Sequence, residues 1–470
     1  MTLRDCALVA ALGFATLLPF IGETRDVGTH ELRHAEIARE MAESGELLVP
    51  TLLGREYVDK PPIMHAMIAG LYRLAGGPSL ALARLPSIVA AVAGALALYG
   101  IGLVLSGREA ALLAAVALPS TLEYHRMARV VRPDMIFVAA ILAACFAVAG
   151  ALRAVGSGSR LSRLALAGAA SGVATVTKGP LGAVVPALLA LLAPVRCPDL
   201  ARLRGREWLS FAAGVVIVLA VWVVPLVVTG HGDYLHRVVF QPDLSGGEPE
   251  PGSHPSYLLA LLTGLLPLTV LLPLVVRDVR RHGYTAALAI PIALLVLLVI
   301  FPKKRPHYLL PVYPFLVLAV AEAVVRATEA RWIRRVTTTI VAASLIAGPL
   351  YYAITPPWPV GEEPKLVMTR RVLSLVDRRR SIVCMDELAE AIAFEGRRDG
   401  VSHVEALGDV IRAARTNGEG SYIALPGGFG EELERAAAGR LDLVHVLSDE
   451  IPVHHRTRGW HLYRVAGVTG

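Results

Sequence analysis

The sequence predicts an all-α polytopic membrane domain of about 11 transmembrane helices, followed by a small α/β soluble domain. Of the 470 residues, 54% are hydrophobic and 18% are charged, and the mean hydropathy is +0.56. Soluble globular proteins carry about 25% charged residues, so this composition excludes a soluble enzyme and a disordered chain. The net charge of +7 indicates membrane orientation rather than a nucleic-acid partner, because the basic residues cluster in short loops between apolar runs.

Eleven apolar runs are close to the length of about 20 residues that crosses a bilayer as a helix. They are residues 6–22, 80–105, 109–125, 134–153, 161–177, 179–195, 208–229, 256–276, 284–301, 307–325 and 336–354. The first run has no small-residue cleavage site and is expected to be a retained span rather than a signal peptide. A shorter apolar block at 62–76 contains two basic side chains and favours an interfacial helix.

Arginine-rich short loops predict the orientation. With the N-terminus in the cytoplasm, the loops on that side carry Arg108, then Arg153, Arg160 and Arg163, then Arg196, Arg202, Arg204 and Arg206, then Arg277, Arg280 and Arg281, and finally Arg326, Arg331, Arg334 and Arg335. Cytoplasmic loops of membrane proteins show this bias. An odd number of spans puts the C-terminus outside, so we expect a multi-pass membrane protein with a cytoplasmic N-terminus and a C-terminal domain on the outer face.

The composition changes near Trp358, which separates a membrane domain (1–355) from a soluble domain (356–470). The second segment holds 15 Lys+Arg and 17 Asp+Glu, a net charge of 15 − 17 = −2. Short β-like runs at 381–385, 401–407, 421–425, 441–447 and 460–465 alternate with helical patterns at 386–396, 408–416 and 429–438. This alternation predicts a compact α/β domain on the outer face.

A long outer loop, residues 23–79, follows the first span. Its first half predicts an amphipathic helix over 30–44 lying on the membrane surface, with Thr29 as N-cap and Gly45 ending the helix. The apolar stripe of this helix is Leu32, Ala35, Ala38, Met41 and Ala42. Four charged side chains are expected merely to solvate it: Glu36, Arg39, Glu40 and Glu43.

Lysine is rare in this chain and concentrates on the outer rim of the membrane domain. Of 46 basic residues, five are lysines: Lys60, Lys178, Lys303, Lys304 and Lys365. The first four fall in predicted outer loops. Arg126, Arg129 and Arg132, which precede Asp134, also fall in an outer loop, although basic residues usually favour cytoplasmic loops. A compact ammonium is a good point-charge partner for phosphate. We therefore expect a phosphate-binding site assembled from several outer loops.

Several short motifs follow one another along the chain. They are the segments 30–41, 48–50, 59–62 and 83–87 in and after the first loop, then Arg132-Pro-Asp134, Thr177-Lys-Gly-Pro180 and 304–311. Together they resemble the protein mannosyltransferase / aminoarabinose lipid A transferase superfamily, in the right order over about residues 1–325. The resemblance implies a GT-C membrane fold and an undecaprenyl or other polyprenyl phosphate-linked sugar donor, used at the periplasmic or extracellular face of a bacterial cytoplasmic membrane.

An inverting glycosyltransferase needs a base for the acceptor and cations for the leaving phosphate. The family's aspartate and tyrosine are replaced here by His30 and His34, whereas Glu31 and Arg33 match, so Glu31, Asp134 and His30 all remain candidates for the base. The donor phosphate is expected to bind Arg33, Lys60, Arg132, Lys178, Lys303, Lys304, Arg305, His307 and Tyr308. No metal ligand set is expected, and no cofactor is required, although a divalent metal is not excluded.

Two other classes stay open at the level of sequence. A transporter or flippase of lipid-linked anions would explain the spans and the cationic rim, but not the carboxylates of the first loop. A non-catalytic glycan-assembly protein would explain the lost aspartate. The acceptor is not specified: a lipid, a glycan and a protein all fit.

Overall fold

The computed structural model describes residues 1–23, 29–240, 254–300, 304–327, 331–354, 364–385, 388–453 and 456–468. Contacts divide the chain into two compact units. The first, here the membrane unit, is Met1–Ile21, Val58–Met64 and Arg84–Ile354; the second, here the loop–sheet unit, is Gly22–Tyr57, His65–Ala83 and Thr355–Gly470. The first outer loop therefore groups with the C-terminal residues. The sequence-based boundary near residue 355 stays a prediction.

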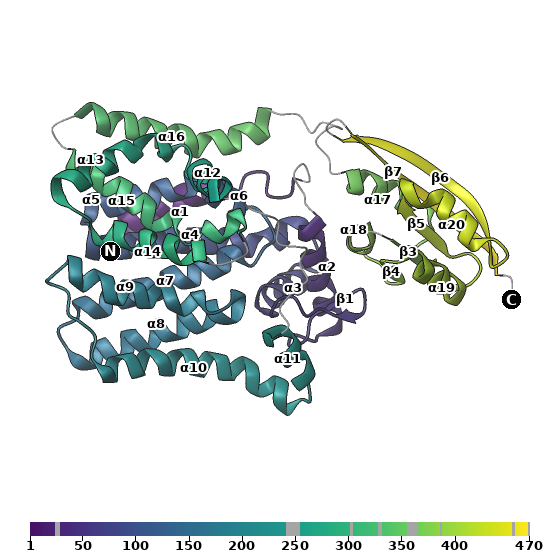
Figure 1. The fold of residues 1–470 in the computed structure, drawn as a ribbon, viewed down its shortest axis with the longest axis horizontal. Helices are drawn as coiled ribbons and strands as arrows, with labels where there is room; N and C mark the ends of the chain where they lie inside the picture. Colours follow the sequence, from purple (N-terminus) through teal and green to yellow (C-terminus); the bar gives the residue numbers. More distant parts are fainter. Residues whose placement is uncertain are drawn as a thin grey trace. The chain divides into compact units, whose positions relative to one another are not determined.

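In the described residues of the membrane unit, the regular secondary structure is helical (Figure 1). Its helices are α1 (Leu3–Leu17), α4 (Leu80–Leu105), α5 (Arg108–Ala117), α6 (Leu122–Ala128), α7 (Asp134–Arg153), α8 (Ser157–Lys178), α9 (Leu181–Arg196), α10 (Gly205–Val228), α11 (Gly232–Phe240), α12 (His254–Gly264), α13 (Leu272–His282), α14 (Ala286–Ile300), α15 (Tyr313–Arg326) and α16 (Arg331–Ile354). Short 3-10 turns are η1 (Leu118–Ser120), η2 (Leu268–Leu271) and η3 (Pro306–Leu309). Each of the eleven predicted runs contains one of these helices.

The predicted count of eleven spans is not confirmed. In the described part of the chain, α4, α7 and α10 are long and apolar enough to cross a membrane, and α12 with α13 would add a fourth if this pair, bent by 96°, is one span. The remaining runs form shorter or more polar helices. For example, the run 109–125 is divided by η1, which contains Pro119, because proline cannot donate the backbone hydrogen bond that would continue a helix.

Small residues let α8 and α10 pack in close contact, with α8 also against α7 (Figure 1). A Cβ atom at Gly168 would lie 2.0 Å from the Phe211 carbonyl oxygen, and one at Gly214 would lie 2.2 Å from the Ala165 carbonyl oxygen. Membrane helices use such small residues to bring their backbones together. This packing fixes α8, whose C-terminal residue is Lys178.

The loop–sheet unit combines the first loop with an α/β sheet. Its elements are α2 (Thr29–Ser44), β1 (Thr51–Leu52), β2 (Arg55–Glu56), most of α3 (Ile63–Ala75), α17 (Pro364–Leu375), β3 (Ile382–Cys384), α18 (Leu388–Gly396), β4 (Val401–His403), α19 (Leu407–Asn417), β5 (Tyr422–Pro426), η4 (Gly427–Phe429), α20 (Gly430–Ala437), β6 (Leu441–Val453) and β7 (Arg456–Val468). The sheet has the order β4-β3-β5-β7-β6. β3 pairs in parallel with β4 and β5, whereas β7 pairs antiparallel with β5 and β6.

All five predicted strands and all three predicted helices of the C-terminal segment are present. The structure adds α17 and lengthens the last two strands into one long hairpin. In the first loop, α2 ends as predicted at Gly45, which has a φ of 83°, and its apolar stripe is buried. The side chain of Thr29 lies outside the described residues, so its predicted capping role is not tested.

The prediction that Glu36 and Arg39 are solvated is wrong, because both side chains are buried, at 0% and 2% exposure. They contact each other rather than water. Helix α2 is therefore covered by protein at Glu36 and Arg39 as well as along its apolar stripe.

Candidate functional site

Asp134 and Lys178 form an ion pair where α7 begins and α8 ends. The two helices are consecutive and packed together, so the start of α7 and the end of α8 meet at the same level. Gly179, with a φ of 102°, ends α8 directly after the lysine. An acid at a helix N-terminus and a base at a helix C-terminus are also favoured by the helix dipoles. Asp134 is buried, at 4% exposure.

Two aromatic side chains of η3 lie beside this pair. The Lys178 Nζ atom is 5.2 Å from the centre of the Tyr308 ring, a cation–π geometry. The rings of His307 and Tyr308 are edge to face, with centres 4.8 Å apart. Asp134 interacts electrostatically with His307 and with Arg132 as well as with Lys178. Five predicted site residues from three sequence-distant motifs therefore meet in the membrane unit.

This cluster, Arg132, Asp134, Lys178, His307 and Tyr308, carries more positive than negative charge. One carboxylate faces one ammonium and one guanidinium, and Arg305 adds a further positive charge that acts on His307. The Lys178 side chain is 16% exposed, so water screens this surplus positive charge only in part and a bound anion would be attracted to it. The arrangement is therefore suited to an anionic group such as a phosphate, which lysine and arginine bind well.

Four other predicted phosphate ligands are not assigned to this cluster. The Lys60 ammonium donates a hydrogen bond to the Asp59 carbonyl at 3.0 Å. Lys304 and Arg305 have partners of their own. Lys303 lies outside the described residues. The roles assigned to these four residues stay predictions.

The candidates His30, Glu31 and Arg33 of the first loop belong to the loop–sheet unit. Glu31 is buried, at 3% exposure, whereas His30 is exposed. Arg33 donates a hydrogen bond from Nε to the Glu390 carboxylate of α18 at 3.2 Å. Glu390 is itself 1% exposed, and no sequence motif pointed to it. Arg33 thus joins the first loop to the C-terminal residues.

A buried histidine pair, which sequence reasoning missed, links α2 to α3. His34 Nδ1 and His65 Nε2 are 2.9 Å apart, and the Tyr57 ring contacts both imidazoles edge to face. Burial lowers the pKa of His65 to about 3, so this ring stays neutral at physiological pH. The signal available in the sequence was the presence of a histidine in each of the two predicted loop helices.

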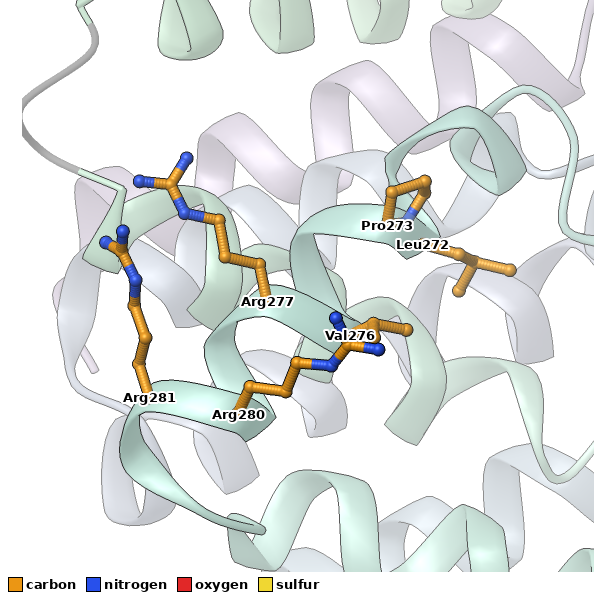
Figure 2. Close-up of a pocket in the computed structure, with 6 residues that line it drawn as sticks. All are labelled: Leu272, Pro273, Val276, Arg277, Arg280 and Arg281. Atoms are coloured by element: carbon orange, nitrogen blue, oxygen red, sulfur yellow. The ribbon is translucent and has the colours of Figure 1, made fainter.

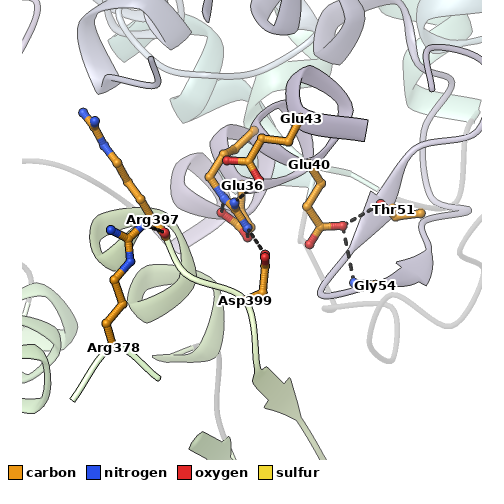
Figure 3. A network of polar contacts seen from close by, with 9 residues as sticks. Glu36, Glu40, Glu43, Thr51, Gly54, Arg378, Arg397 and Asp399 are labelled. Carbon is orange, nitrogen blue, oxygen red and sulfur yellow. Dashed lines mark hydrogen bonds and ion pairs between the residues drawn. The ribbon is translucent and has the colours of Figure 1, made fainter. Parts of the chain in front are cut away.

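A second polar network surrounds Arg39 on α2 (Figure 3). Arg39 binds both oxygens of Glu36, at 2.9 and 2.8 Å, Glu43 at 2.5 Å and Asp399 at 3.2 Å. Glu40 accepts a hydrogen bond from the Thr51 hydroxyl at 2.5 Å. Burial raises the pKa of Glu36 to about 7, against the opposing effect of Arg39. Here carboxylates outnumber cations.

Metal binding is not tested by these contacts. Among the described residues, no three His, Cys, Asp or Glu side chains gather as ligands of one ion.

Comparison with known proteins bears on both units. A family model described as dolichyl-phosphate-mannose-protein mannosyltransferase matches residues 59–227. The chain is 29% identical over 292 residues to the undecaprenyl phosphate-alpha-4-amino-4-deoxy-L-arabinose arabinosyl transferase of Pectobacterium atrosepticum, covering 60% of this chain and 50% of that protein. It is 27% identical to the transferase of the same name from Edwardsiella ictaluri, covering 63% and 55%. The chain thus spans about half the length of the curated relatives it matches.

Solved structures match over nearly the whole chain. ArnT from Cupriavidus metallidurans in the apo state has a TM-score of 0.75 at 17% identity, covering 99% of this chain and 98% of that one. ArnT bound to undecaprenyl phosphate has a TM-score of 0.74 at 18% identity, covering 99% and 98%. The oligosaccharyltransferase of Archaeoglobus fulgidus has a TM-score of 0.53 at 10% identity, covering 94% and 71%. The chain thus resembles the ArnT-like GT-C glycosyltransferases in sequence over part of its length and in fold over nearly all of it.

These matches confirm the predicted resemblance, and the solved structures confirm the GT-C fold. The matched segment 59–227 contains Lys60, Arg132, Asp134 and Lys178, so the Asp134–Lys178 pair lies within the part of the chain that resembles the family. Tyr308 lies outside that segment in the sequence, and the fold of the membrane unit brings its ring next to Lys178.

Proposed function

We propose that this chain transfers a sugar, with inversion, from a polyprenyl-phosphate-linked donor to a lipid, glycan or protein acceptor at the outer face of a bacterial cytoplasmic membrane. The observation that carries this proposal is the ion pair of buried Asp134 with half-buried Lys178, beside Tyr308, His307 and Arg132. Its surplus positive charge suits a lipid phosphate. The likeness of the fold to ArnT, including the structure bound to undecaprenyl phosphate, supports it.

The reaction breaks the bond between the sugar's anomeric carbon and the phosphate oxygen. The acceptor attacks the opposite face of that carbon and loses its proton, while negative charge grows on the departing lipid phosphate. Cations placed where this charge develops stabilise the transition state. In this proposal Lys178 supplies the nearest such charge, and Arg132 adds a second.

Asp134 is proposed to position Lys178 rather than to act as the base. Its Oδ1 atom already accepts a hydrogen bond from the Lys178 ammonium, and that bond holds the ammonium in one place. The same bond leaves the carboxylate less able to accept the acceptor's proton. The base is therefore proposed to be Glu31, with His30 as the alternative; Arg33, held by Glu390, orients the helix that carries both.

The test is a transfer assay with the purified full chain and a synthetic polyprenyl phosphate carrying a radiolabelled sugar. We expect release of polyprenyl phosphate together with a labelled product of opposite anomeric configuration, and continued activity in the presence of a chelator. Intact donor carried across vesicle membranes without cleavage would instead identify a flippase. Lipid and glycan analysis of a deletion strain and its complemented parent would identify the acceptor.

A further inference from the structure

Helix α13 carries three arginines on one face, next to an apolar segment of the same face. Figure 2 shows Arg277, Arg280 and Arg281 on this helix together with Leu272, Pro273 and Val276. These six residues follow the spacing i, i+1, i+4, i+5, i+8 and i+9, which places them along one side of an α-helix. They line a hollow of about 610 Å³.

The three guanidinium groups have no protein partner among the described residues. None forms an ion pair or donates a hydrogen bond there, and all three are exposed. The one acid of this helix, Asp278, is buried and turned to other groups: it accepts from Arg326 at 2.7 Å and lies 3.0 Å from His282. This face of α13 therefore carries positive charge that no acidic side chain of the described residues neutralises.

Three other arginines of the predicted cytoplasmic loops are paired with acids, whereas Arg196, Arg202 and Arg206 have no acid partner among the described residues. Arg108 binds Asp5 through two hydrogen bonds of 2.9 and 2.7 Å. Arg160 pairs with Glu207 at 3.3 Å, and Arg334 with Glu109 at 3.1 Å. Orientation in the membrane requires only positive charge, so it accounts for all of these arginines alike. It does not account for three guanidinium groups that line one hollow together with apolar side chains of the same helix.

We infer that this face of α13 binds the headgroup of an anionic phospholipid. Guanidinium groups bind phosphate oxygens through paired, charge-assisted hydrogen bonds. Leu272, Pro273 and Val276 would contact the acyl chains while the three arginines contact the phosphate, an arrangement that a free phosphate ion would not need. Basic hollows at the cytoplasmic edge of membrane helices are suited to such lipids.

The experiment measures lipid retained by the purified full chain in phosphatidylcholine nanodiscs with and without phosphatidylglycerol, by native mass spectrometry. The variant replaces all three arginines with glutamine (R277Q/R280Q/R281Q). Each arginine near an anionic lipid is worth about fivefold in affinity, so we expect the variant to bind phosphatidylglycerol roughly 100-fold more weakly. The control, R196Q/R202Q/R206Q, removes the same charge from another predicted cytoplasmic loop and should bind normally.

A lysine version (R277K/R280K/R281K) keeps the charge and should retain most of the binding, which guards against a folding defect in the glutamine variant. Equal retention of phosphatidylglycerol by the wild type, the glutamine variant and the control would overturn the proposal. So would displacement of the lipid by inorganic phosphate at the same concentration, because the site would then recognise a free anion. This inference does not depend on the transferase activity.

Discussion

The two charged networks of this molecule differ in the sign of their net charge. Around Lys178, one carboxylate serves an ammonium and has a guanidinium nearby. Around Arg39, three carboxylates serve one guanidinium. The first network is short of anions and the second is short of cations.

The difference separates a binding site from a structural one. The network at Lys178 gains a partner when a phosphate arrives, so its charges are available for a ligand. In the network at Arg39 the guanidinium is already held by three carboxylates of the protein, and these contacts join α2 to the segment that contains Asp399. We therefore expect substitutions at Lys178 to reduce turnover and substitutions at Arg39 to reduce stability.

The largest expected effect is that of Lys178→Met. Loss of the cation nearest the leaving phosphate should lower kcat/KM by about 10³-fold. It also leaves the buried Asp134 carboxylate unpaired, which should lower the free energy of unfolding by about 3–5 kcal/mol. The double variant Asp134→Asn/Lys178→Met removes both charges, so it should regain stability without regaining activity. Recovery of activity in the double variant would show that Lys178 is only structural.

Next is Arg39→Met, which should lower the free energy of unfolding by about 3–5 kcal/mol because Glu36 is left buried without a partner. The matched control is Glu43→Gln, which removes an exposed partner of the same arginine and should cost under about 1 kcal/mol. Denaturant unfolding of both purified variants measures this. Equal, small losses would mean that the network does not hold α2 in place.

Glu31→Gln should reduce turnover by about 10²-fold, the usual order for losing a positioned base, with normal expression. His30→Ala should cost less if Glu31 is the base, and as much or more if the imidazole has that role. Turnover is measured with saturating donor. Near-wild-type rates in both variants would remove the first loop from the chemical step.

The pH dependence of stability gives a smaller effect with a definite sign. The pKa of Glu36 is raised from 4.5 to about 7 in the fold. A raised folded-state pKa means that the unfolded chain loses this proton first, so the contribution of Glu36 to stability is complete below about 4.5 and is lost as the pH rises through about 7. His65, whose pKa is lowered, contributes the opposite slope below about 6.5, so the difference between wild type and Glu36→Gln must be measured. A difference that is constant across this range would contradict the assignment.

The smallest expected effect is that of Glu390→Gln on turnover. Arg33 is partly exposed and keeps a neutral acceptor in this variant, so the loss should be about tenfold or less, from looser positioning of α2. A loss as large as that of Glu31→Gln would show that the C-terminal residues take part more directly than proposed.

Much of the secondary structure followed from the sequence, because hydrophobic periodicity and turn residues are local signals. The helix ending at Gly45 and the strands of the C-terminal segment are examples. The span count did not follow in the same way, because proline and loop positions shorten helices inside continuous apolar runs, as at Pro119.

Only part of the site could be predicted, because local motifs identify residues but not their tertiary contacts. The rarity of lysine singled out Lys178, and the Arg132-Pro-Asp134 motif singled out its partner, but their pairing depends on how α7 packs against α8. Glu390 carried no local signal at all. It lies 357 residues from Arg33 in the chain, and only tertiary structure brings these two side chains together.

The most direct test of the central claim is the affinity of the purified full chain for undecaprenyl phosphate, measured by competition against a fluorescent polyprenyl phosphate. The account predicts binding by the wild type and by Glu43→Gln. It predicts binding at least about tenfold weaker in the folded double variant Asp134→Asn/Lys178→Met, since one charge-assisted contact to phosphate is worth about 1.5–3 kcal/mol. Unchanged affinity in that double variant would contradict the assignment of the Lys178 cluster as the donor phosphate site.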